Sequence, residues 1–153
     1  MKRPLTLVGA VIFVAGAGLA WLRAPAAPPL PTVTVWKSAT CGCCGHWIEH
    51  LRAAGFTVVA HDTEDLPLIT QQHGVAENLV SCHVAVVGGY VVEGHVPADL
   101  IKRLLQEHPA HIAGLSVPGM VPGSPGMETG GQKPPYDVIA WDSAGKTTVY
   151  AKR

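Results

Sequence analysis

Three of the four cysteines stand where a short strand meets an amphipathic helix, and this arrangement constrains the fold more than any other feature. Residues 32–36 form a short segment rich in β-branched side chains, as in a strand, and residues 56–60 form a second such segment. Between them apolar residues recur at helical spacing, and Gly55 then suits a helix C-terminus. The apolar residues are Cys44, Trp47, Ile48 and Leu51. This strand–helix–strand unit predicts parallel pairing through a right-handed crossover.

The following residues continue the alternation of strands and helices. A second helix is predicted from about Asp65 to His73, and residues 84–87 and 90–92 predict a hairpin around Gly88-Gly89. An apolar stripe over residues 100–105 predicts a third helix. The order β-α-β-α-β-β-α is typical of the thioredoxin-like fold, a mixed sheet covered by helices. We therefore predict an α/β domain of this kind over residues 32–116.

A loop rich in proline and glycine follows the predicted domain. Residues 118–135 contain five prolines and five glycines in eighteen positions, which excludes a helix or a central strand. Residues 137–141 and 147–151 then predict a terminal hairpin. Because the chain resumes regular structure, we expect the loop to lie over the domain. Residues 117–153 are therefore interpreted as a C-terminal extension made of this loop and the hairpin.

The N-terminus predicts export. Lys2 and Arg3 precede an uncharged apolar stretch over residues 5–22, which is the layout of a secretory signal peptide or a membrane anchor. The length of the stretch lies between those typical of the two, so both alternatives stay open for residues 1–23. Residues 24–31 carry four prolines and indicate a stiff linker. The expected location is the periplasm, either soluble or anchored to the inner membrane by residues 5–22.

Composition excludes two broad classes of protein. The 153 residues include 11 basic and 11 acidic side chains, so the chain lacks the basic excess of a nucleic-acid-binding protein. Apolar residues make up 48% and charged residues 14%, which argues against global disorder. We expect no nucleic acid among the partners.

The cysteines are the strongest chemical signal. Cys41, Cys43 and Cys44 lie at the predicted start of a helix, where the dipole and the free N–H groups favour thiolates. Cys41 and Cys44 have the C-x-x-C spacing of a redox dithiol, and Cys43 adds a third sulfur that such a site does not require. Cys82 precedes the hairpin, where the thioredoxin-like plan brings it to the dithiol. Four thiolates favour Cu(I), with zinc as competitor, whereas two structural disulfides are the alternative.

Methionine and histidine residues extend the possible ligand set. Met120 and Met127 each follow Pro-Gly in the Pro/Gly-rich loop, and thioethers select Cu(I) over zinc. His83 is the strongest histidine candidate because it adjoins Cys82, and His95, after the hairpin, is a weaker one. The remaining histidines are interpreted as solvent-exposed. They are His46, His50, His61, His73, His108 and His111.

The chain resembles the CopG-like family of exported copper-resistance proteins. The resemblance rests on residues 36–47, 81–83, 93–97 and 117–128, which include the C-x-C-C motif, Ser-Cys-His and two Pro-Gly-Met turns. It implies a thioredoxin-like domain whose extension helps to bind a copper cluster, and a role in interconverting Cu(I) and Cu(II) in the periplasm. The ligands it implies are Cys41, Cys43, Cys44, Cys82, His83, Met120 and Met127.

Three hypotheses on function follow. The first is a copper-binding redox protein with Cys41 and Cys44 as catalytic residues. The second is a non-enzymatic chaperone or scavenger that uses the same ligands and passes Cu(I) to periplasmic copper efflux or chaperone proteins. The third is a metal-free thiol–disulfide oxidoreductase. The first two depend on Cys82 lying close to the sulfurs of the C-x-C-C motif, whereas the third needs only Cys41 and Cys44.

Overall fold

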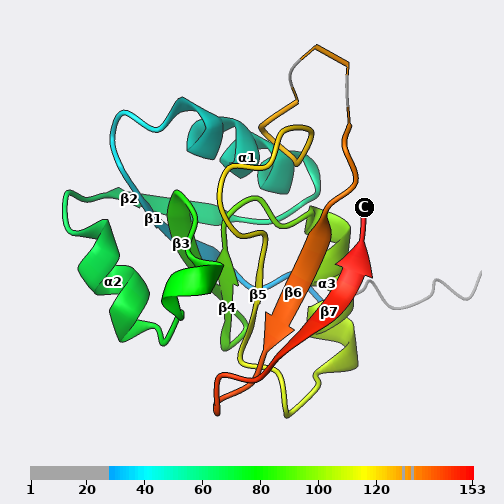
Figure 1. Cartoon of the computed structure of the whole chain (residues 1–153). Helices are drawn as coiled ribbons and strands as arrows, with labels where there is room; N and C mark the ends of the chain where they lie inside the picture. The colour runs from blue at the N-terminus through cyan, green and yellow to red at the C-terminus, as the bar shows by residue number, and fades with distance from the viewer. Residues whose placement is uncertain (1–27, 129, 132) are drawn as a thin grey trace, which may run out of the picture.

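The computed structural model describes residues 28–128, 130–131 and 133–153, so the predicted signal or anchor lies outside the described part of the chain. One seven-stranded mixed sheet forms the centre of the molecule (Figure 1). Its strands are β1 (Val33–Lys37), β2 (Val58–Asp62), β3 (His83–Val87), β4 (Tyr90–Glu93), β5 (Gly114–Ser116), β6 (Asp137–Trp141) and β7 (Thr147–Lys152). The helices are α1 (Gly42–Ala53), α2 (Leu66–Gln72), the short 3-10 helix η1 (Glu77–Leu79) and α3 (Ala98–Glu107). The α/β class is therefore confirmed.

The strand order is β2-β1-β3-β4-β5-β6-β7. Strands β1 and β2 pair in parallel through α1, as the crossover predicts, and β3 and β4 form the predicted antiparallel hairpin. The three-residue strand β5 was not predicted. It pairs in parallel with β4 and antiparallel with β6, so the terminal hairpin continues the same sheet.

Helices cover both faces of the sheet. Helices α1 and α3 pack on one face over the main hydrophobic core, to which α1 contributes Trp47, Ile48 and Leu51. Helix α2 and η1 pack on the other face around Val84 and Trp141. The predicted apolar stripe of α1 is thus confirmed, because each of its four residues is buried. From residue 28 onward, no described helix is long and apolar enough to cross a membrane.

Gly55 ends helix α1 as predicted, with a φ of +93°. Its N–H donates to the carbonyl of Arg52, and the N–H of Phe56 donates to that of Leu51, which is the Schellman pattern. This pattern holds Phe56 at the helix end with its side chain in the core. Strand β2 consequently begins two residues later than predicted, at Val58.

Candidate metal centre

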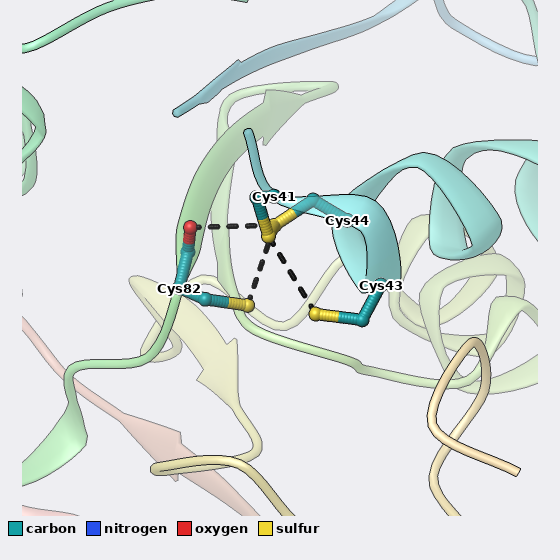
Figure 2. Close-up of side chains that lie close together, drawn as sticks. All are labelled: Cys41, Cys43, Cys44 and Cys82. Atoms are coloured by element: carbon teal, nitrogen blue, oxygen red, sulfur yellow. Dashed lines mark hydrogen bonds between the residues drawn. A yellow bond between two sulfur atoms is a disulfide. The ribbon is translucent and has the colours of Figure 1, made fainter. Parts of the chain in front are cut away.

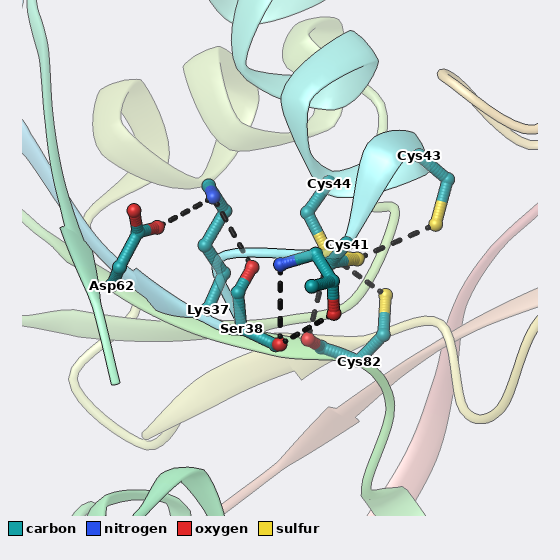
Figure 3. Close-up of polar contacts among 8 residues, drawn as sticks. Lys37, Ser38, Cys41, Cys43, Cys44, Asp62 and Cys82 are labelled. Atoms are coloured by element: carbon teal, nitrogen blue, oxygen red, sulfur yellow. Dashed lines mark hydrogen bonds and ion pairs between the residues drawn. A yellow bond between two sulfur atoms is a disulfide. The ribbon is translucent and has the colours of Figure 1, made fainter. Parts of the chain in front are cut away.

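The turn between β1 and α1 positions the C-x-C-C motif (Figure 3). The N–H of Cys41 donates to the carbonyl of Ser38 over 3.1 Å, and Lys37 Nζ donates to the same carbonyl over 3.2 Å. Lys37 also forms an ion pair of 2.6 Å with Asp62 on β2. These contacts tie the start of α1 to the ends of β1 and β2.

Cys41 is the N-cap residue of α1, and its side chain does not cap the helix. Cys41 and Cys44 are joined by a disulfide, whereas Cys43 and Cys82 are free thiols. Cys44 is fully buried and the other three are partly exposed. The alternative of two structural disulfides is therefore not what the structure contains.

All four sulfurs gather at this helix start (Figure 2). Sγ of Cys82 lies 3.5 Å from Sγ of Cys44, and Sγ of Cys43 lies 3.5 Å from Sγ of Cys41. The four sulfur atoms all lie within 4.8 Å of one another. The predicted approach of Cys82 to the C-x-C-C motif is confirmed, and the spacing allows several sulfurs to share one soft metal ion.

Two buried imidazoles extend the cluster on the Cys82 side. Sγ of Cys82 lies 3.1 Å from Nε2 of His95 and 3.4 Å from Nδ1 of His83. Nδ1 of His95 lies 2.8 Å from the carbonyl oxygen of Pro125. Because a carbonyl can only accept, Nδ1 carries the proton and Nε2 offers its lone pair toward Cys82. A carbonyl partner of this kind orients histidine ligands in metal sites.

Burial sets the protonation states of these groups. Burial, together with a smaller contribution from the nearby Cys43, raises the pKa of the Cys82 thiol to about 12. It lowers the pKa of His83 to about 3, with a smaller contribution from His95, and it also lowers the pKa of His95. Both imidazoles are therefore neutral at pH 7, which is the form that binds metal. A metal ion would displace the proton of Cys82.

Comparison with known proteins agrees with this geometry. Residues 79–127 match a family described as "Protein of unknown function, DUF411". Two solved structures named "Copper resistance protein copG", Form 2 and Form 1, are 41% and 40% identical to the chain. They superpose with TM-scores of 0.77 and 0.76, covering 82% and 81% of this chain and 99% and 98% of theirs. A search of curated proteins finds no match.

The chain belongs to the CopG family. The matched segment contains Cys82, both buried imidazoles and the two loop methionines, so the family model covers the half of the centre that lies outside the C-x-C-C motif. The sulfur cluster and the imidazoles supply donor types that hold soft and borderline metal ions.

The described part of the Pro/Gly-rich loop in this CopG-family chain packs against the domain beside the cysteine cluster. Gly119 donates its N–H to the carbonyl of Val80 and accepts a hydrogen bond from the Ser81 hydroxyl. A Cβ added at Gly126 would lie 2.7 Å from the backbone nitrogen of Trp47, so the loop packs directly on the first turns of α1. Met120 is half exposed and Met127 is partly buried. Their role as ligands stays a prediction.

His95 is the residue that the sequence prediction undervalued. A two-residue turn at Gly88-Gly89 pairs Val87 with Tyr90, and counting outward along the two strands places Cys82 opposite His95. The predicted hairpin therefore already contained the signal for this neighbour. Sequence patterns alone treated His95 as an isolated residue after a strand.

The other histidines differ in their environments. His46 is exposed, as predicted. The prediction of a solvent-exposed His50 is wrong, because its Nε2 accepts a hydrogen bond of 3.1 Å from the N–H of Ala98 at the start of α3. Burial accordingly lowers the pKa of His50. His61 and His73 pack against the ring of Trp36.

Glu93 is a buried carboxyl group that the sequence analysis did not single out. Its Oε1 accepts a hydrogen bond of 2.6 Å from the N–H of Ser81, and its Oε2 has no hydrogen-bond partner among the described residues. Burial raises its pKa to about 8. Glu93 therefore holds the backbone next to Cys82, on the sheet face that carries Val84, its cross-strand partner.

Proposed function

We propose that this protein is an exported copper-binding protein of copper resistance that binds Cu(I) through its cysteine cluster and interconverts Cu(I) and Cu(II). Copper is the substrate in this proposal. The observation that carries it is the gathering of four sulfurs within 4.8 Å of one another, with two imidazoles beside Cys82. Thiolates select Cu(I), whereas imidazole also suits Cu(II), so the mixed donor set can serve both states.

The proposed ligands are those that the sequence predicts, with His95 added. They are Cys41, Cys43, Cys44, Cys82, His83, His95, Met120 and Met127. Cys41 and Cys44 are proposed as the catalytic pair, because their disulfide makes them the redox-active members of the cluster. With this pair reduced, four sulfurs can bridge more than one Cu(I).

We also propose a thioredoxin-like fold and a periplasmic location. The fold is supported by the β-α-β-α-β-β-α order through α3, with a C-x-x-C pair at the start of α1. The location is supported by the sequence of residues 1–23, as a cleaved signal or an anchor. Periplasmic copper efflux or chaperone proteins are the partners that suit this location.

Copper binding is tested on the reduced full chain by metal analysis and by competition for Cu(I) with a chromophoric chelator. We expect bound copper, and Cys82→Ser should lower the Cu(I) affinity by more than about 100-fold, because loss of an outer-shell partner alone costs about 10–100-fold. His95→Ala should also weaken binding, whereas His46→Ala, an exposed control on α1, should not. Protein that binds no copper would contradict the proposal.

Interconversion is tested with excess copper and substoichiometric protein. We expect the protein to oxidise or reduce many copper ions per molecule when a suitable redox partner is supplied. Tight binding without turnover would favour the non-enzymatic chaperone or scavenger instead.

The Cys41–Cys44 disulfide favours a second candidate, the metal-free thiol–disulfide oxidoreductase. In that case Cys41→Ser should abolish exchange with a model disulfide, while Cys82→Ser should have little effect. Loss of copper binding in Cys82→Ser would oppose this candidate, because metal-free exchange assigns no role to Cys82.

A further inference from the structure

We infer that the Cys41–Cys44 dithiol is the two-electron store of the centre, which reduces two Cu(II) ions while the remaining donors hold the Cu(I) product. This inference rests on the proposed function and assigns the source of the electrons. It starts from one observation. The structure divides the centre into a bonded sulfur pair and a set of donors that stays free, namely Cys43, Cys82, His83 and His95.

The free donors form a site of their own. Ligand atoms of Cys82, His83 and His95 lie within 4.8 Å of one another, and none of them belongs to the disulfide. The contact of Nδ1 of His95 with the carbonyl of Pro125 directs the Nε2 lone pair toward Cys82 while Cys41 and Cys44 are bonded. A copper ion on these residues can therefore keep its ligands when Cys41 and Cys44 become bonded.

The two parts of the centre are in contact. Sγ of Cys44 lies 3.5 Å from Sγ of Cys82, and Sγ of Cys41 lies 3.5 Å from Sγ of Cys43. Each sulfur of the redox pair thus touches a thiol that is free to bind copper. Electrons can pass from the pair to copper on either free thiol across a single sulfur–sulfur contact.

The reaction balances within one protein molecule and two Cu(II) ions. The S–H bonds of Cys41 and Cys44 break, one S–S bond forms between them, and two protons leave to solvent. The two electrons reduce two Cu(II) to two Cu(I). The observed disulfide is the product state of this step.

The test adds two equivalents of Cu(II) to the fully reduced full chain without oxygen. A Cu(I)-specific chelator then measures the Cu(I) formed, and alkylation with mass spectrometry identifies the cysteines that have been oxidised. We expect two Cu(I) per protein, a fall from four free thiols to two, and a disulfide that maps to Cys41 and Cys44. The control variant His46→Ala, altered only on the exposed face of α1, should give the same result.

The double variant Cys41→Ser/Cys44→Ser separates this inference from the proposed function. Because two of the proposed ligands are lost, it should bind Cu(I) supplied directly more weakly than the natural chain, through Cys82, His83 and His95. At Cu(I)-saturating conditions it should nevertheless reduce Cu(II) at least tenfold more slowly than the natural chain. A disulfide that maps to Cys43 or Cys82 in the natural chain, or four thiols retained after Cu(II) addition, would overturn the inference alone. Failure of the natural chain to bind Cu(I) would overturn the proposed function with it.

Discussion

Gly126→Ala tests whether the Pro/Gly-rich loop must seat on α1 for the centre to form. Gly126 has a φ of +84°, and a Cβ there would lie 2.7 Å from the nitrogen of Trp47 and 2.9 Å from the carbonyl oxygen of Cys43. Both contacts are backbone atoms of a helix, which cannot rotate away as a side chain could. The substitution therefore combines an unfavourable backbone conformation with a steric conflict.

The magnitude follows from these two costs. A left-handed conformation costs a residue with a Cβ about 1–2 kcal/mol, and overpacking a well-packed site costs about 1–3 kcal/mol. Their sum is about 2–5 kcal/mol, a large part of the 5–15 kcal/mol that stabilises a typical domain. Gly145→Ala is the matched control, because Gly145 has a φ of +79° but an added Cβ there would have no atom of the described chain within 4 Å. Its stability should fall only by the cost of the left-handed conformation, about 1–2 kcal/mol.

Denaturant unfolding of both variants in the same redox state measures this difference, which should be about 1–3 kcal/mol. Gly126→Ala should also weaken Cu(I) binding by about 10–100-fold, since displacing the neighbouring Pro125 removes the carbonyl that orients His95. Gly145→Ala should bind copper like the natural chain. Equal stability losses in the two variants, together with unchanged Cu(I) affinity in Gly126→Ala, would refute this reasoning.

Two further predictions concern the buried Glu93 and the half-buried His50, which lie outside the cysteine cluster. Because the pKa of Glu93 is raised to about 8, folding favours its protonated form, and the free energy of unfolding should fall by about 2 kcal/mol between pH 6.5 and pH 8. Denaturant unfolding at a series of pH values measures this fall, and Glu93→Gln should lack it. The same pH dependence of stability in Glu93→Gln and the natural chain would contradict the burial argument. His50→Ala removes the acceptor at the start of α3 and should cost about 1–2 kcal/mol in thermal or denaturant unfolding, whereas the exposed His46→Ala should cost less than about 0.5 kcal/mol. Equal losses in these two variants would remove the capping role of His50.

Much of the fold could be predicted because its signals are local. The spacing of apolar residues in α1, the Schellman glycine at Gly55 and the Gly88-Gly89 turn each act within a few residues, and each is confirmed. Strand β5 was missed because its three residues carry no periodic pattern. Its Gly114 is required by a distant contact, since an added Cβ would collide with the ring of Trp141 and the carbonyl of Val91.

The same distinction between local and long-range signals applies to the candidate site. The clustering of Cys82 with the C-x-C-C motif followed from the order of strands and helices, which sequence patterns reveal. The capping role of His50 could not be predicted in this way, because it depends on how α1 and α3 lie side by side on the sheet. His46 and His50 lie four residues apart on one helix, yet within the described chain only the side chain of His50 is hydrogen-bonded to a neighbouring helix.

The segment that carries Cys82 is held from several directions, and this explains why the centre includes a buried carboxyl group. Glu93 binds the N–H of Ser81, the Ser81 hydroxyl donates to the loop at Gly119, and the N–H of Gly94 donates to the carbonyl of His83. Each contact joins residues that are more than ten positions apart in the chain, so none has a local sequence signature. Ligands fixed in this way lose little conformational freedom when a metal ion arrives. Burial of the Glu93 carboxyl group is unfavourable by itself, and the same group fixes the backbone next to Cys82. Glu93 is therefore a positioning residue of the candidate metal centre, although it faces the opposite side of the sheet.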